Sequence, residues 1–144
     1  MSLKDLLNKG KIEEVEKSDL DFARVESDLS ASADNIGAGN YEWGLSIGYH
    51  AVLRAGMGLM NSLGYRVRGN EHHKSVFLFL ASFEELNVLA KYFDRIRRKR
   101  NEFIYRGFDE VSEREADEVL VKAKGFVLII RTFVSKKGTE VKDE

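Results

Sequence analysis

The side chains best suited to chemistry in this chain form a basic run that ends with an amide and a phenol, Asn101 and Tyr105. The cations of the run are Arg95, Arg97, Arg98, Lys99, Arg100 and Arg106. Arginine binds phosphate through paired hydrogen bonds, so this run is the best candidate surface for a polyanion. Cations late in a helix also complement the helix dipole and pair with nearby acids, so an ordinary solvent-exposed face remains the alternative.

Arg100 differs from its basic neighbours because it falls on an apolar helix face. Positions 86, 89, 93, 96, 100 and 103 follow spacings of three and four, and Arg100 is the one charged residue among them. A guanidinium on such a face costs desolvation free energy unless it meets a carboxylate, a phosphate or water. We therefore expect Arg100 to have a partner that the sequence alone does not identify.

The histidines of the chain are His50, His72 and His73. Adjacent residues of a helix point about 100° apart, so His72 and His73 do not form a pair of metal ligands, and we predict no metal site. In the first turn of a helix they are polar surface residues that can line a ligand-binding cleft. His50 adjoins a stripe of small residues, so we expect it to be buried or hydrogen-bonded. No pattern indicates a cofactor.

The composition limits the class of protein and the partners that it can attract. A length of 144 residues leaves room for one domain. With Lys+Arg 23 and Asp+Glu 24, the overall charge does not attract nucleic acid, so polyanion binding requires a local patch. The absence of cysteine excludes disulfides and thiolate chemistry. Without a long apolar stretch or a signal-peptide core, we expect a soluble cytoplasmic protein with no membrane partner.

The spacing of apolar residues and the absence of proline predict an all-α fold. We expect an up-and-down antiparallel bundle of four to five helices, with no convincing strand. The predicted helices cover about 18–36, 40–63, 70–83, 86–105 and 112–134. The predicted organisation is an N-terminal extension (1–17), the bundle (18–134) and a disordered tail (135–144).

A stripe of small residues marks the second predicted helix. Its members are Gly44, Gly48, Ala51, Ala55, Gly58 and Ser62. Each glycine costs about 1 kcal/mol in a helix, which close packing against another backbone can offset. We therefore expect a neighbouring helix to approach this stripe closely.

The segment Arg100-Asn101-Glu102-Phe103-Ile104-Tyr105 resembles the Arg-Asn-x-x-x-His/Tyr signature of HEPN-domain proteins. The resemblance continues upstream through the helix start at 40–43, the stretch 49–64 and the His72-His73 pair. It covers roughly residues 18–134 and implies a helical bundle that forms a homodimer, with the arginine motifs facing each other across a cleft. Many such proteins are metal-independent ribonucleases, often toxins paired with a nucleotidyltransferase antitoxin.

The resemblance places Arg100 at the active-site arginine, Asn101 at the adjacent polar position, and Tyr105 where nuclease members have histidine. Histidine titrates near pH 6.5 and tyrosine near 10, so tyrosine is a poor base at neutral pH. We therefore predict an RNA- or nucleotide-binding module, the HEPN half of a toxin–antitoxin pair. The alternatives are a metal-independent endoribonuclease toxin and a non-catalytic dimeric interaction protein. The additional ligand-binding candidates are Arg97, Arg98, Arg106, His72 and His73.

Overall fold

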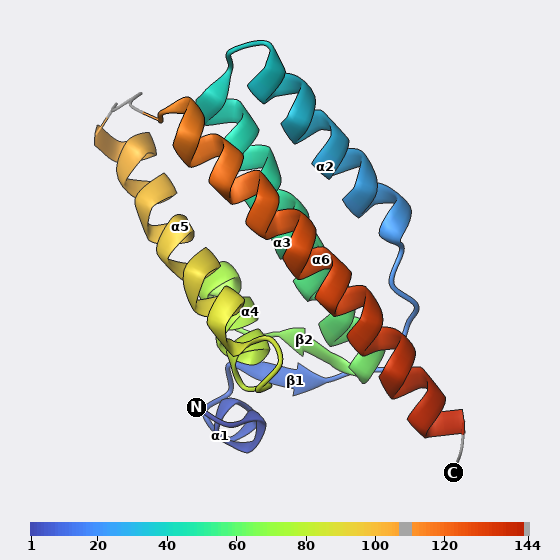
Figure 1. Cartoon of the computed structure of the whole chain (residues 1–144). Coiled ribbons are helices and arrows are strands. Elements are labelled where there is room, and N and C mark those ends of the chain that lie inside the picture. The colour runs from blue at the N-terminus through green and yellow to red at the C-terminus, as the bar shows by residue number, and fades with distance from the viewer. Residues whose placement is uncertain (107–110, 143–144) are drawn as a thin grey trace.

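The computed structural model describes the backbone of residues 1–106 and 111–142, and the side chains of 1–101 and 111–136. Its elements, shown in Figure 1, are α1 (Leu3–Asn8), β1 (Ile12–Glu14), α2 (Phe22–Gly37), α3 (Tyr41–Leu63), β2 (Tyr65–Val67), α4 (His72–Ala81), α5 (Asn87–Arg106) and α6 (Glu113–Lys142). No helix within the described ranges is long and apolar enough to cross a membrane.

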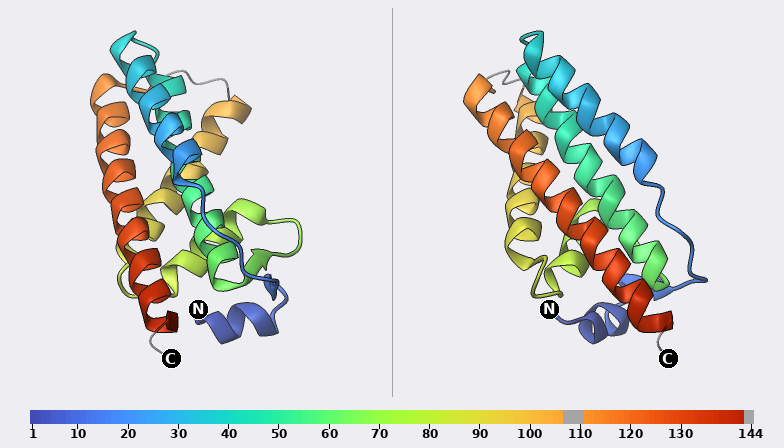
Figure 2. Two further views of the ribbon diagram at one scale, coloured as in Figure 1. Left: turned by 90° about the vertical axis from the view of Figure 1, so that its right-hand side faces the viewer. Right: turned by 45° about the vertical axis from the view of Figure 1, so that its right-hand side comes forward.

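Helix α3 is the centre of the molecule and contacts α2, α4, α5 and α6 (Figure 2). Helices α2 and α6 run along α3 and also touch each other, whereas α4 and α5 pack together against the rest of α3. The largest buried side chains between these helices are Tyr49, Phe77, Phe79, Phe93 and Phe126. The predicted all-α antiparallel bundle is confirmed.

The expectation that the chain has no strand is wrong. Strands β1 and β2 pair antiparallel, with Ile12 opposite Val67 and Glu13 opposite Arg66, and Glu13 and Arg66 also form a cross-strand ion pair of 2.5 Å. Three residues are too few for an alternating pattern to stand out from a charged connection, so these strands have no usable sequence signal. The pairing holds the N-terminal segment against the bundle, where Ile12 joins the core.

The stripe of small residues on α3 is the contact surface for α2, as predicted. A Cβ added at Gly44 would lie 3.2 Å from the backbone oxygen of Ser32 and 2.4 Å from Cγ1 of Ile36. The buried Ser32 hydroxyl donates a hydrogen bond of 2.6 Å to the carbonyl oxygen of Gly44. Farther along α3, Gly58 makes room for Leu20. Close packing of α2, and of Leu20 just before it, on α3 therefore offsets the helix penalty of these glycines.

Two helix boundaries differ from the predictions. Helix α2 begins at Phe22 rather than near Ser18, because Asp21 caps it and the backbone N–H of Ser18 donates to the carbonyl of Asn61 at the end of α3. Helix α6 continues to Lys142, where a disordered tail was predicted from residue 135. One glycine in this stretch costs only about 1 kcal/mol, and no proline stops the helix. The predicted cap at Ser112 is present, since the N–H of Glu115 donates to its hydroxyl over 3.1 Å.

Candidate anion-binding site

Arg100 lies on the face of α5 that packs against α3. Its Nε donates to the hydroxyl oxygen of Ser46 over 3.2 Å, and its guanidinium carbon lies 5.3 Å from the centre of the Tyr49 ring. Among the described residues, no carboxylate forms an ion pair with Arg100. The partner that the sequence left open is therefore a hydroxyl and an aromatic face, and the positive charge is not neutralised by them.

Tyr49 joins Arg100 to His73 of α4. The Tyr49 ring is fully buried, and its hydroxyl lies 3.1 Å from His73 Nδ1. Burial raises the pKa of the Tyr49 phenol to about 12, although the cations Arg100 and Arg97 act in the opposite direction. The pKa of His73 is lowered, first by partial burial and then by the positive charge of Arg100 and the nearby His50 and Arg97. At neutral pH the phenol is protonated and the imidazole is uncharged.

This hydrogen bond determines which nitrogen of His73 carries the proton. A phenol with a pKa of about 12 keeps its proton, and Nδ1 of His73 is the acceptor that the described residues offer to it. Tyr49 therefore donates to Nδ1, and neutral His73 carries its own proton on Nε2. The imidazole has an N–H donor at Nε2 instead of a free proton acceptor.

An open surface pocket of about 380 Å³ brings several predicted residues together. It is lined by Asn70, Glu71, His72, His73, Lys74, Arg97 and Asn101. The carboxylate in this set, Glu71, lies 3.4 Å from the Lys11 ammonium and 3.9 Å from that of Lys74, so its charge is balanced. The remaining groups are mainly hydrogen-bond donors, the set that an anion requires.

Arg97 and Arg98 both approach Asp94 but differ in exposure and in their position relative to the pocket. Arg97 is mostly buried, with 16% of its side chain exposed, and its Nε donates to Asp94 over 2.9 Å. This contact leaves the terminal nitrogens of the guanidinium for other partners. Arg98 is 64% exposed, lies 3.8 Å from the other Asp94 oxygen and does not line the pocket. The structure thus places Arg97 at the site and Arg98 beside it.

The structure describes some of the other predicted residues and leaves two of their side chains outside its range. The side chains of Tyr105 and Arg106 lie outside the described residues, so their predicted roles remain expectations. His50 is exposed, which corrects the expectation of burial: its side chain leaves the small-residue stripe and lines a different pocket, between α2 and α3. Within the described ranges, no three His, Asp or Glu side chains gather as a metal site would require.

Two residues of the site, Tyr49 and Ser46, were not identified from the sequence. Tyr49 was interpreted only as a core residue, and Ser46 was not considered. A signal did exist, because residues three apart share a helix face, and Ser46 and Tyr49 place two polar groups on one face of this helix. Their pairing with α4 and α5 has no local signature.

Comparison with known proteins gives one match. A family model described as HEPN domain matches residues 22–133, a range that begins with α2 and contains all of the residues that line this pocket. Neither the curated proteins nor the solved structures contain a match to the chain.

Proposed function

Because this chain belongs to the HEPN domain family, we propose that it is an RNA- or nucleotide-binding module whose anion site lies between α4 and α5. One observation carries the proposal: His73, Arg97 and Asn101 line a single pocket. Arg100 adds a positive charge that pairs with no carboxylate among the described residues. Its guanidinium lies over the Tyr49 ring, whose hydroxyl is hydrogen-bonded to His73. A phosphodiester is an acceptor-only anion, which such a set of donors complements.

The same geometry favours binding over cleavage. RNA cleavage without a metal requires a base that removes the proton of the 2′-hydroxyl. His73 carries its proton on Nε2, the arginines do not release theirs, and Glu71 is balanced by two lysines. The described side chains of the pocket therefore hold a phosphate better than they accept a proton.

We also propose that the module works as a homodimer and as the HEPN half of a toxin–antitoxin pair with a nucleotidyltransferase. HEPN domains often dimerise, which supports the first part. Light scattering on the purified protein tests the dimer, and a strictly monomeric protein at micromolar concentration would contradict it. Co-purification with a co-expressed candidate nucleotidyltransferase tests the pair, and separate elution of the two proteins would contradict it.

The binding proposal is tested with a labelled single-stranded RNA of about 12 nucleotides in EDTA, by fluorescence anisotropy and on a denaturing gel. The variants are Arg100→Ala and Asn101→Ala, and the control is Arg95→Ala. Arg95 is an exposed arginine of the same helix whose guanidinium lies 5.8 Å from the centre of the Tyr92 ring, outside the pocket. A charged hydrogen bond contributes about 1.5–3 kcal/mol, so Arg100→Ala weakens binding by roughly 10- to 100-fold.

The control separates specific binding from general charge loss. Arg95→Ala leaves the affinity within about twofold, because its contribution is a screened surface charge. Equal losses in the Arg95 and Arg100 variants would overturn the proposed site. RNA that the wild type cuts in EDTA, and that Arg100→Ala leaves intact, would replace the binding module with the endoribonuclease alternative.

A further inference from the structure

A pocket that we call the methionine pocket adjoins the anion site at the start of α4. Its volume of about 370 Å³ falls within the range of about 300–1,000 Å³ that is typical of small-molecule sites. Its apolar lining comes from α3, β2 and α4 and consists of Met57, Met60, Val67 and Val76. Met60 and Val76 are almost fully buried, whereas Met57 is 46% exposed. An apolar ring that entered the pocket would therefore exchange water for contact with the core.

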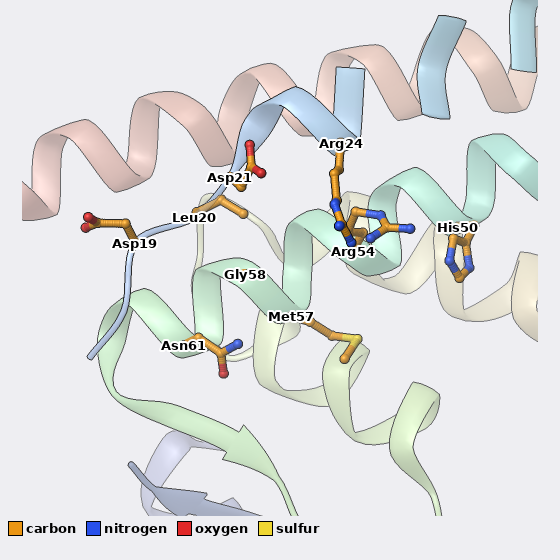
Figure 3. Close-up of a pocket in the computed structure, with 9 residues that line it drawn as sticks. All are labelled: Asp19, Leu20, Asp21, Arg24, His50, Arg54, Met57, Gly58 and Asn61. Atoms are coloured by element: carbon orange, nitrogen blue, oxygen red, sulfur yellow. The ribbon is translucent and has the colours of Figure 1, made fainter. Parts of the chain in front are cut away.

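The polar groups of the methionine pocket suit an uncharged ligand. Arg66 already forms its 2.5 Å ion pair with Glu13 across the two strands. Asn61 is partly buried, and its side-chain amide forms no hydrogen bond with the described residues. Figure 3 shows Asn61 and Met57 on neighbouring turns of α3, where they also line the pocket between α2 and α3. The Asn61 amide is therefore available as both a donor and an acceptor.

The methionine pocket and the anion pocket are neighbours, because His72 and His73 line both of them. The anion pocket extends from these histidines to Arg97 and Asn101 of α5. One pocket thus offers apolar surface and an amide, and the adjoining one offers cationic donors. A nucleotide has the same two parts, an uncharged aromatic base and an anionic phosphate, joined by a sugar.

We propose that the methionine pocket receives the base of the nucleotide whose phosphate binds between α4 and α5, and that Asn61 recognises this base. The inference rests on the proposed function, because the phosphate must lie at the anion site. Met57 and Met60 supply polarisable thioethers, which make favourable contacts with aromatic rings. An asparagine amide pairs with adenine through its N7 acceptor and N6 donor, so adenine is the base that this pocket suits best.

The test compares AMP with ribose 5-phosphate, which has the same sugar and phosphate but no base, by calorimetric titration in EDTA. AMP binds about tenfold more tightly than ribose 5-phosphate, because only AMP buries a ring among the methionines. Asn61→Ala weakens AMP binding by about 2- to 10-fold, the effect of lost neutral hydrogen bonds, and leaves ribose 5-phosphate unchanged. The matched control is Asn8→Ala, at an exposed asparagine of α1 outside both pockets, which changes neither affinity.

The outcomes separate this inference from the proposed function. If AMP, ribose 5-phosphate and the 12-nucleotide RNA all fail to bind, the proposed function fails and the base pocket fails with it. If Arg100→Ala weakens RNA binding while AMP binds no better than ribose 5-phosphate, the base pocket alone is wrong. Equal losses of both small ligands in Asn61→Ala would also overturn it.

A second variant protects the test against misfolding. Alanine favours a helix more than asparagine does, and the contacts of the Asn61 backbone carbonyl with Ser18 and Gly64 do not involve its side chain, so Asn61→Ala should fold. A thermal melt checks this. Should the variant unfold, Met57→Ala decides, because a half-exposed side chain can be shortened without loss of the core. It weakens AMP binding by about twofold and leaves ribose 5-phosphate unchanged, and an unchanged AMP affinity would contradict the base pocket.

Discussion

The α2–α3 contact and the α4–α5 site are built by opposite rules. The α2–α3 contact repeats one feature, a small residue at helical spacing, and the buried Ser32 hydroxyl closes it onto Gly44. The α4–α5 site has no such repeated spacing. His73, Tyr49 and Arg100 come from three helices and meet through one hydrogen bond and one ring face. The packing of α2 on α3 therefore follows from a repeated spacing in the sequence, whereas the site depends on single contacts between residues far apart in the sequence.

The difference predicts where a small change has a large effect. In the α2–α3 contact a Cβ added at Gly44 or Gly48 would meet atoms of α2, so stability is sensitive to side-chain volume there. The α4–α5 site is open to solvent on one side. A substitution there therefore changes the charge and the protonation of the site more than it changes the stability of the fold. Substitutions chosen from each region can sharpen this contrast or break it.

The largest effect on stability is expected for Gly44→Ala. The new Cβ would lie 2.4 Å from Cγ1 of Ile36 and 3.2 Å from the Ser32 carbonyl oxygen, so α2 must shift. Overpacking of this kind costs about 1–3 kcal/mol, which exceeds the gain of about 1 kcal/mol in helix propensity. Urea unfolding monitored by circular dichroism measures the change. A variant as stable as the wild type would show that the close approach is not needed.

Tyr49→Phe is expected to have the next largest effect. It removes the hydroxyl that donates to His73 Nδ1 and keeps the buried ring that packs under Arg100. One hydrogen bond contributes about 1 kcal/mol to the free energy of unfolding, so the loss is moderate. RNA affinity falls as well, because His73 no longer has a fixed proton on Nε2. Unchanged affinity together with reduced stability would limit Tyr49 to a structural role.

Gly125→Ala is the matched control for the α2–α3 contact. Gly125 lies in the middle of α6, and an added Cβ would find no atom within 4 Å. Replacing an unobstructed helical glycine stabilises a protein by about 0.4–1 kcal/mol. The free energy of unfolding measured in urea should therefore rise in Gly125→Ala, whereas it falls in Gly44→Ala. Destabilisation here would mean that α6 has a tight neighbour at this position.

The fold was largely predictable because its signals are repetitive. The apolar spacings along α3 and α6, the left-handed Gly64 at the end of α3 and the cap at Ser112 each follow from a local rule. The paired strands were missed because three residues carry no period. The start of α2 was misplaced because the N–H of Ser18 has a partner in α3, and no local rule identifies a partner so far away in the sequence.

The site was predictable only in part, because some of its contacts join residues that are far apart in the sequence. Arg100 stood out because it interrupts an apolar stripe, and the histidine pair stood out by composition. That Arg100 rests on Tyr49, and that Tyr49 fixes His73, depends on how three helices meet.

The smallest expected effect is the pH dependence of stability that His73 introduces. Its pKa is lower in the folded protein than its ordinary value, so the unfolded chain binds a proton first as the pH falls. The free energy of unfolding therefore decreases on acidification below about pH 6.5. Arg100→Ala removes one of the positive charges that lower this pKa, so it raises the pKa of His73 and weakens the pH dependence. Titration of the His73 ring by NMR in the wild type and in Arg100→Ala measures both effects. An unchanged pKa would mean that the two groups do not sense each other, and the site between α4 and α5 would lose its electrostatic link to the arginine motif.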